Sequence, residues 1–146
     1  MRKKIIIVDD NAAYLSVVRV LLKQYYDVFP APSAAKLFNV LEKLIPDLVL
    51  LDVNMPEMNG FEAIAILKEN PRYKDIPVVF LTAKDDEVSA EKGLELGAAD
   101  YVTKPFSGPI LLKRISNLLL IEQQKRELQA NIVTIMDLRE QLENKE

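Results

Sequence analysis

Several short apolar runs in this sequence end in a side chain that could take part in chemistry. Asp9 and Asp10 end one such run, Asp52 ends a second, and Thr82 and Lys104 end two more. In an α/β fold with a parallel sheet, residues at the carboxyl ends of neighbouring strands converge on one crevice. We therefore expect these side chains to lie together, although the chain spreads them from position 9 to position 104.

An assembly of carboxylates, a hydroxyl and an ammonium group suits a Mg²⁺ ion and a phosphoryl group. Two carboxylates about 4 Å apart repel each other by about 4 kcal/mol at an effective dielectric constant of about 20, and a divalent cation removes this cost. Ligation by oxygen alone favours Mg²⁺ over a softer metal, and the backbone carbonyl of Asn54 is a further candidate ligand. Lys104 and Thr82 would hold phosphoryl oxygens. A carboxylate such as that of Asp52 can serve as the acceptor nucleophile.

Each of these residues also has an ordinary structural explanation. The pair Asp9 and Asp10 could cap a helix, and Asp52 could be a turn residue. Thr82 alone would be a strand-end hydroxyl, and Lys104 alone a solvated charge before a turn. Coincidence is a poor account of all of them at four strand ends in this order, so we favour a shared site.

The composition excludes several classes of function. The 146-residue chain contains neither cysteine nor histidine, which excludes disulfides, the usual zinc sites and a Ser-His-Asp triad. Its net charge of −3 gives no reason to expect nucleic-acid binding, because domains that bind nucleic acid are usually basic. The apolar runs are too short for a signal peptide or a membrane span, so we expect a cytoplasmic protein without membrane contact.

Short β-branched runs alternate with amphipathic stretches along the chain, the pattern of consecutive βαβ units. We expect a flavodoxin-like, doubly wound α/β fold with five helices and a five-stranded parallel sheet in the order 2-1-3-4-5. Pro30 and Pro32 are expected in the turn after the second strand. Ser33 and Ser107 are candidate helix N-caps, and Gly97 is a candidate helix terminus. The expected strands are residues 5–8, 27–29, 47–51, 77–81 and 100–102, and the expected helices are residues 13–25, 34–44, 60–69, 87–96 and 108 onwards.

The C-terminal part of the chain contains no Pro or Gly after Pro109, so its helix could continue almost to the end, roughly 55 Å at 1.5 Å per residue. A small α/β domain cannot cover a helix of this length. Apolar residues recur at heptad spacing along it, diluted by Lys125 and Arg139 at companion positions. We favour a coiled-coil dimer seam over an amphipathic end that frays past Glu127. The expected seam consists of Leu118, Ile121, Leu128, Ile132, Ile135 and Leu142.

The motifs at the strand ends resemble those of the two-component response-regulator receiver domain, the CheY-like family. Residues 6–11 resemble the family's opening strand and acidic pair, and residues 52–60 are similar to its phosphorylation-site motif and the following turn. Residues 81–83 match its signalling hydroxyl, and residues 104–106 its lysine-proline turn. The resemblance covers residues 3–122 without interruption.

The resemblance implies a role for each acidic residue. Asp52 would accept a phosphoryl group from the phosphohistidine of a sensor histidine kinase or phosphotransfer protein. Asp9, Asp10 and Asp52 would hold Mg²⁺ together with the backbone carbonyl of Asn54. The side chains of Asn54 and Lys84 fall where the family varies and dephosphorylation is tuned, so the lifetime of the phosphoryl group is not predicted.

The resemblance also implies a switch. Thr82 and Lys104 would bind the phosphoryl group, and the bond between Lys104 and Pro105 would be cis. Tyr101 would be a rotating aromatic side chain, although by itself it would be more typical of a core residue. Phosphorylation would remodel the face built from the fourth helix, the fifth strand and the fifth helix.

We expect a receiver domain at residues 1–122 and a helical extension, a coiled coil or signalling linker, at residues 123–146. The chain would catalyse only its own phosphorylation and dephosphorylation. Either it acts alone through contacts, or the helix leads into an output domain. The tail weakly resembles signalling helices that join receivers to cyclic-dinucleotide phosphodiesterases or cyclases.

Two other functions fit the expected fold. A flavodoxin-like FMN-binding module would need a hydroxyl- and glycine-rich phosphate loop after the first strand, where this chain has residues 9–11, two acids and an amide. A haloacid-dehalogenase-type phosphatase also uses an aspartyl nucleophile, but its two acids stand one residue apart, whereas here they are adjacent.

Overall fold

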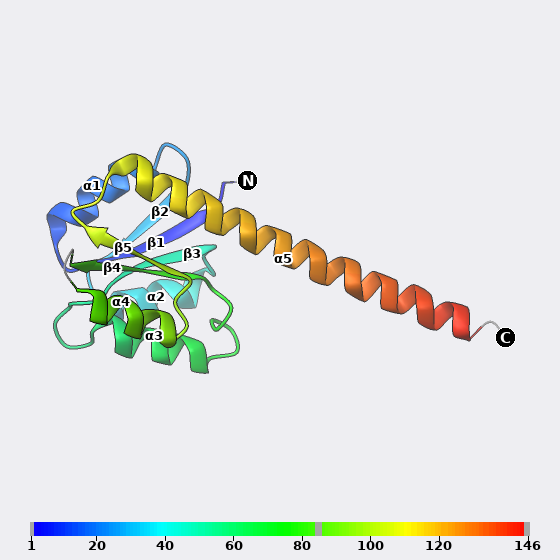
Figure 1. Ribbon diagram of the computed structural model, residues 1–146. Helices are drawn as coiled ribbons and strands as arrows, with labels where there is room; N and C mark the ends of the chain where they lie inside the picture. Colours follow the sequence, from blue (N-terminus) through cyan, green and yellow to red (C-terminus); the bar gives the residue numbers. More distant parts are fainter. Residues whose placement is uncertain (1, 84–85, 145–146) are drawn as a thin grey trace.

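The computed structural model describes residues 2–83 and 86–144 (Figure 1). Over these residues, strands and helices alternate as the sequence predicts. The strands are β1 (Lys4–Val8), β2 (Asp27–Ala31), β3 (Leu48–Asp52), β4 (Val78–Ala83) and β5 (Asp100–Lys104). The helices are α1 (Ala12–Leu22), α2 (Ala34–Lys43), α3 (Gly60–Glu69), α4 (Glu87–Glu95) and α5 (Gly108–Glu143).

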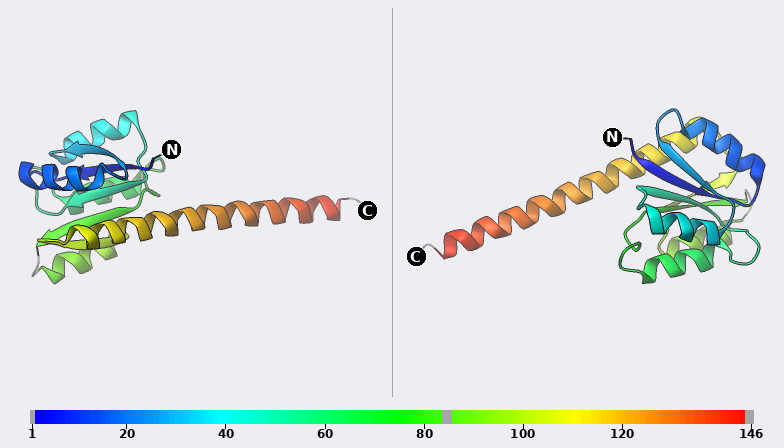
Figure 2. Two further views of the ribbon diagram at one scale, coloured as in Figure 1. Left: turned by 90° about the horizontal axis from the view of Figure 1, so that it is seen from above. Right: turned by 180° about the vertical axis from the view of Figure 1, so that it is seen from behind.

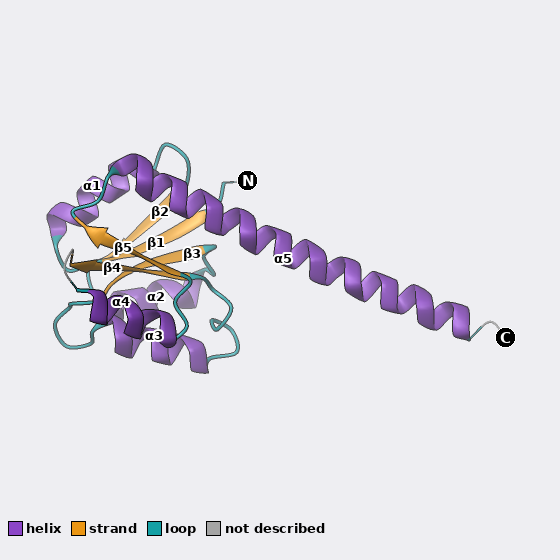
Figure 3. Cartoon of the chain, in the orientation of Figure 1, coloured by secondary structure: helices purple, strands orange, loops and turns teal. Residues whose placement is uncertain are grey.

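The five strands form one parallel sheet in the order β2-β1-β3-β4-β5, which confirms the predicted doubly wound fold. Helices α1 and α5 cover one face, and α2, α3 and α4 cover the other (Figure 3). Because strand residues alternate between faces, Ile6 and Val8 of β1 join the core cluster beneath α2 and α3, while Ile5 and Ile7 pack with α1 and α5. The strand order reverses at β1 and β3, which places a crevice at their carboxyl ends.

The second strand is longer than the sequence predicts. Pro30 lies inside β2, paired with Ile7, and the strand continues to Ala31. The prediction of a turn at Pro30 was wrong because β2 is an edge strand. Proline is tolerated there, since the N–H group that it lacks would point away from the sheet and would have no partner strand. Strands β3, β4 and β5 also extend further than predicted at their carboxyl ends, so Asp52 and Lys104 are the last residues of their strands.

The helix ends mostly follow the predicted signals. Ser33 caps α2, since its Oγ accepts a hydrogen bond of 3.1 Å from a backbone N–H in the first turn. Gly97 follows α4 with a φ of 107°. Ser107 is the N-cap residue of α5 but makes no capping hydrogen bond through its side chain. Helix α1 ends at Leu22, earlier than predicted, because the chain must turn back to begin β2 at Asp27.

Helix α5 is 36 residues long and extends far beyond the sheet (Figure 2). Its first turns bury Leu111, Ile115 and Leu119 against the domain. Of the predicted seam, Leu118 is partly buried against the domain core, whereas the residues further along are exposed to solvent, with Leu128 60% and Ile135 63% exposed. Within the described residues, no helix combines the length and the apolar character that crossing a membrane requires.

Candidate functional site

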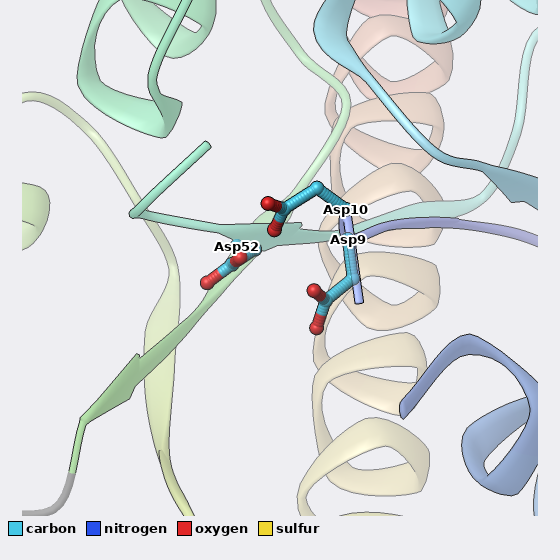
Figure 4. Close-up of side chains that lie close together, drawn as sticks. All are labelled: Asp9, Asp10 and Asp52. Atoms are coloured by element: carbon cyan, nitrogen blue, oxygen red, sulfur yellow. The ribbon is translucent and has the colours of Figure 1, made fainter. Parts of the chain in front are cut away.

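Three carboxylates meet at the carboxyl ends of β1 and β3 (Figure 4). Asp9 and Asp10 directly follow β1, and Asp52 ends β3, the strand that pairs with β1. One carboxylate oxygen from each residue lies within 4.8 Å of the others. Asp9 and Asp52 are buried, whereas Asp10 is exposed. The acids that are far apart in the sequence are therefore brought together as predicted.

The acidic pair does not cap helix α1. Asn11 is the N-cap residue, and its Oδ1 accepts hydrogen bonds from the backbone N–H groups of Ala13 (2.9 Å) and Tyr14 (3.2 Å). The Oδ1 atom of Asp9 accepts a hydrogen bond of 2.9 Å from the backbone N–H of Asn11. That bond orients the Asp9 carboxylate and leaves its other oxygen, Oδ2, for contacts within the site.

Lys104 joins the two buried carboxylates. Its Nζ lies 2.6 Å from Oδ2 of Asp9 and 3.4 Å from Oδ1 of Asp52. The same atom lies 4.4 Å from the centre of the Tyr14 ring, a cation–π contact. The peptide bond between Lys104 and Pro105 is cis. Sequence reasoning missed Tyr14, although its place in the first turn of the helix that follows β1 is the signal that could have found it.

The electrostatics of the site are dominated by burial and by this close packing of charges. Burial, and after it the charge of Asp9, raises the pKa of Asp52, the ammonium of Lys104 opposes both, and the net result is a pKa of about 7. Burial alone would lower the pKa of Lys104, but its hydrogen bond to Asp9 and the charges of both carboxylates outweigh burial and raise it. Without a further cation, Asp52 is therefore divided between its neutral and charged forms near neutral pH.

Thr82 and Tyr101 lie on the strands beside the acidic cluster. Thr82 is buried one position beyond Leu81, the β4 residue that pairs with Asp52. Among the described residues, no group forms a hydrogen bond with its Oγ1. A buried hydroxyl without a partner costs roughly 1–3 kcal/mol, which a ligand oxygen in this position would recover. Tyr101 on β5 pairs with Phe80 and packs, half-buried, against the core cluster.

The acidic cluster opens to solvent through a cavity of about 320 Å³. Asn54 lines this cavity, as the prediction of a ligand there requires. Tyr14, Ala83 and Pro105 contribute the less polar parts of the lining. Lys84, where the sequence resemblance locates a second variable position, lies outside the described residues.

The turn after Asp52 is tightly constrained. Glu57 has a φ of 67°, and the N–H of Met58 donates a hydrogen bond of 2.8 Å to the carbonyl of Pro56, closing a γ-turn. A Cβ atom on Gly60 would lie 2.5 Å from the backbone oxygen of Asp52. Only glycine therefore lets α3 begin this close to the end of β3.

Fold and site together define a doubly wound α/β protein with a cluster of three carboxylates, which could hold a metal ion, at its topological switch point. Residues 5–116 match the response regulator receiver domain. The chain belongs to this family, a component of two-component signalling.

Several known proteins are similar to this chain. A Vibrio cholerae serotype O1 protein named "Probable cyclic di-GMP phosphodiesterase" is 42% identical over 121 residues, 83% of this chain and 27% of the relative. Hybrid signal transduction histidine kinase D of Dictyostelium discoideum is 34% identical over 128 residues, 88% of this chain and 8% of the relative. The structure of the Vibrio cholerae chemotaxis protein CheY4 superposes with a TM-score of 0.75 at 29% identity, covering 80% of this chain and 98% of that protein. The chain thus spans only a minor part of the two longer relatives.

Proposed function

We propose that this chain is the phosphoacceptor of a two-component phosphorelay and that Asp52 receives the phosphoryl group from the phosphohistidine of a kinase or phosphotransfer protein. The arrangement that supports the proposal is the buried Asp52 carboxylate, flanked by Asp9 and Lys104, together with the Thr82 hydroxyl on the neighbouring strand, which has no hydrogen-bond partner among the described residues. Asp52 as nucleophile and Lys104 as a fixed cation line one solvent-accessible cavity, and Thr82 lies on β4, the strand that pairs with β3. Positioning and charge neutralisation of this kind supply most of the catalysis in phosphoryl transfer.

In the transfer, an oxygen of the Asp52 carboxylate forms a bond to phosphorus while the phosphorus–nitrogen bond of the donor breaks. The imidazole nitrogen of the donor keeps the electron pair and takes up a proton. Lys104 binds one phosphoryl oxygen through its ammonium, and Thr82 donates its hydroxyl to another. The chain catalyses only its own phosphorylation and dephosphorylation and turns over no separate substrate.

The donor set fits Mg²⁺. Asp9, Asp10 and Asp52 would hold the ion together with the backbone carbonyl of Asn54, all of them hard oxygen ligands. Bound Mg²⁺ supplies positive charge that offsets the carboxylates and the incoming phosphoryl group. Because Lys104 Nζ now lies 2.6 Å from Asp9, Lys104 would release that carboxylate when the ion binds.

Phosphorylation would act through the strand residues next to the site. Thr82 would move toward the phosphoryl group to satisfy its hydroxyl, and Tyr101 would turn inward to fill the space. These shifts would remodel the face formed by α4, β5 and α5 and bias two states that already interconvert. Arg114 of α5, 2.8 Å from the carbonyl of Tyr101 and 3.2 Å from Asp100, would carry the change into the long helix.

Helix α5 would carry the output signal. Its exposed apolar residues, with Leu128 and Ile135 at the centre, would pair with those of a second copy in a parallel homodimer. The helix would then report the state of the receiver to an output domain or partner in the cytoplasm, without direct binding to nucleic acid or membrane. The names of the two longer relatives are consistent with a receiver that serves an attached or separate enzyme.

The proposal is tested with a small phosphodonor and Mg²⁺. The wild-type chain should gain the mass of one phosphoryl group, lost at alkaline pH as expected for an acyl phosphate. Asp52→Ala should gain none, while the matched exposed control Glu57→Gln should be labelled like the wild type. Full labelling of Asp52→Ala would remove Asp52 from this role.

A further inference from the structure

A second and larger cavity, of about 600 Å³, lies at the amino ends of the strands, the opposite end of the sheet from the acidic site. It is bounded by the loops that lead into β3, β4 and β5 and by residues 122–129 of α5. Pro46 and Ile76 are buried at the cavity and give its lining an apolar part. Its volume is within the range of roughly 300–1,000 Å³ typical of small-molecule sites.

Cationic side chains from three separate segments converge on this cavity. Lys68 comes from α3, Arg72 and Lys74 come from the loop before β4, and Lys125 and Arg126 come from α5. The whole chain carries a net charge of −3, so a local excess of positive charge is not a consequence of composition. Like charges gathered in one concave site raise its affinity for anions.

The acidic residues at the cavity do not balance these cations. Of the three that line it, Asp47 accepts a hydrogen bond of 2.8 Å from the backbone N–H of Lys4. Glu122 is paired with Lys125 at 3.5 Å. Asp75 is the third acid of the lining, so five cations face three anions.

Three of the cations form no ion pair within the described residues, although Nε of Arg126 donates a hydrogen bond of 3.4 Å to the carbonyl of Glu122 and Arg72 lies over the ring of Tyr73. Within the described part of the chain, no carboxylate lies within salt-bridge distance of Arg72, Lys74 or Arg126. Lys68 has a structural use instead, since its Nζ donates a hydrogen bond of 3.0 Å to the carbonyl of Lys74. The stem of Lys68 also covers Gly97.

We propose that this cavity binds a small organic polyanion of nucleotide size, with phosphate groups on the cationic lining and a planar or apolar part against Pro46 and Ile76. Arg72 and Arg126 can each grip a phosphate with two hydrogen bonds, which a lysine cannot do. Because Arg72 belongs to the domain and Arg126 to α5, one ligand held by both would brace the projecting helix against the domain. Binding of the ligand would thereby influence the direction in which α5 projects from the domain.

The test is calorimetric titration of the full chain at low salt with ADP, pyrophosphate and the uncharged nucleoside adenosine. EDTA in the buffer removes divalent cations. The acidic site at the carboxyl ends of the strands then repels the anions and does not contribute to binding. We expect saturable one-to-one binding of ADP, weaker binding of pyrophosphate and none of adenosine. Arg72→Gln and Arg126→Gln should each weaken ADP binding by about tenfold, the equivalent of one charge-assisted contact.

The matched control is Lys113→Gln, which removes an exposed cation of α5 that does not line the cavity and should leave ADP binding unchanged. ADP should also slow hydrogen exchange at the backbone amides of residues 122–129. Absence of saturable binding at millimolar ADP, or equal weakening by Lys113→Gln, would overturn the proposal. So would binding of an acidic peptide together with no binding of either small anion, because the cavity would then serve a macromolecule.

Discussion

Lys104 supplies positive charge among the carboxylates of the site. Its ammonium contacts Asp9 and Asp52, yet burial and the charge of Asp9 outweigh it and keep the pKa of Asp52 raised at about 7. A carboxylate whose charged form is disfavoured in this way is stabilised more by a divalent ion than a carboxylate that is already neutralised. When no ion is bound, the charged form of Asp52 lowers the stability of the folded chain.

This cost predicts a specific pH dependence of stability. Folding raises the pKa of Asp52 from 3.8 to about 7. Between these values the folded chain keeps a proton that the unfolded chain has lost, so the free energy of unfolding should fall as the pH rises through this window and level off above it. Asp52→Asn should abolish this component. Denaturant unfolding of both chains in EDTA across the window measures it.

The difference in stability between Asp52→Asn and the wild type should widen as the pH rises from about 4 to about 7. Above about pH 7, added Mg²⁺ should reduce this difference in stability, because it should stabilise the wild type alone. Parallel profiles of the two chains at all pH values would show that Asp52 is not destabilised by burial and by the charge of Asp9.

Tyr14 is predicted to position Lys104 for the proposed transfer. The ring contact at 4.4 Å is worth roughly 0.5–2 kcal/mol, so Tyr14→Leu should slow phosphorylation by roughly 2- to 30-fold at saturating Mg²⁺. Tyr14→Phe keeps the ring and should stay within about twofold of the wild type. Initial rates with a small phosphodonor measure the effect.

Equal rates for Tyr14→Leu and Tyr14→Phe would contradict this role of the ring. A loss of rate accompanied by a matching loss of thermal stability in Tyr14→Leu would instead point to packing against Phe106, whose ring centre lies 6.1 Å away. If the wild type itself is not labelled, the result contradicts the proposed function and does not test the role of Tyr14.

At the scale of elements, the start of α3 packs closely against the end of β3, where Asp52 lies. A Cβ atom at Gly60 would lie 2.5 Å from the backbone oxygen of Asp52 and 2.9 Å from the Phe80 ring. Gly60→Ala should therefore lower the free energy of unfolding by about 1–3 kcal/mol, as overpacking does elsewhere. Denaturant unfolding measures this loss.

Gly108→Ala is the matched control for Gly60→Ala. A Cβ atom there would meet first the side-chain end of Leu21 at 3.3 Å, which can move aside. The substitution should be nearly neutral. If Gly60→Ala is equally neutral, the close approach of α3 to β3 is not a constraint on the site.

At the scale of the whole molecule, α5 divides into a half that belongs to the domain and a half that is exposed. The exposed part carries an apolar stripe, and exposed stripes usually mark contact surfaces. We predict that sedimentation will show a concentration-dependent dimer, strengthened by phosphorylation. Leu128→Asp combined with Ile135→Asp should give a monomer, because each places a charge in the seam.

Val133→Asp is the control for these seam variants. Val133 is 57% exposed, much like Leu128 at 60%, but lies off the seam. The dimer should therefore survive this substitution. A monomeric wild type at high concentration, with and without phosphorylation, would show that the stripe is an amphipathic surface without a partner copy.

The order of the elements and the convergence of the site were readable from the sequence. Alternating β-branched and amphipathic segments favour a parallel sheet, and a parallel sheet brings the carboxyl ends of its central strands together. That single geometric rule joined Asp9, Asp52 and Lys104 across the chain, as the structure confirms. Local signals were sufficient here because the chemistry stands at strand ends, where apolar runs stop.

Other features depended on the tertiary structure. Whether Pro30 interrupts a strand depends on which strand lies at the sheet edge, and no local signal states this. The raised pKa of Asp52 and the ring contact of Tyr14 arise from burial and from neighbours distant in sequence. The cavity of about 600 Å³ is assembled from loops and a helix that meet only after folding. Residue type and spacing thus determined which elements form and which groups could react, whereas packing decided their charge states and contacts.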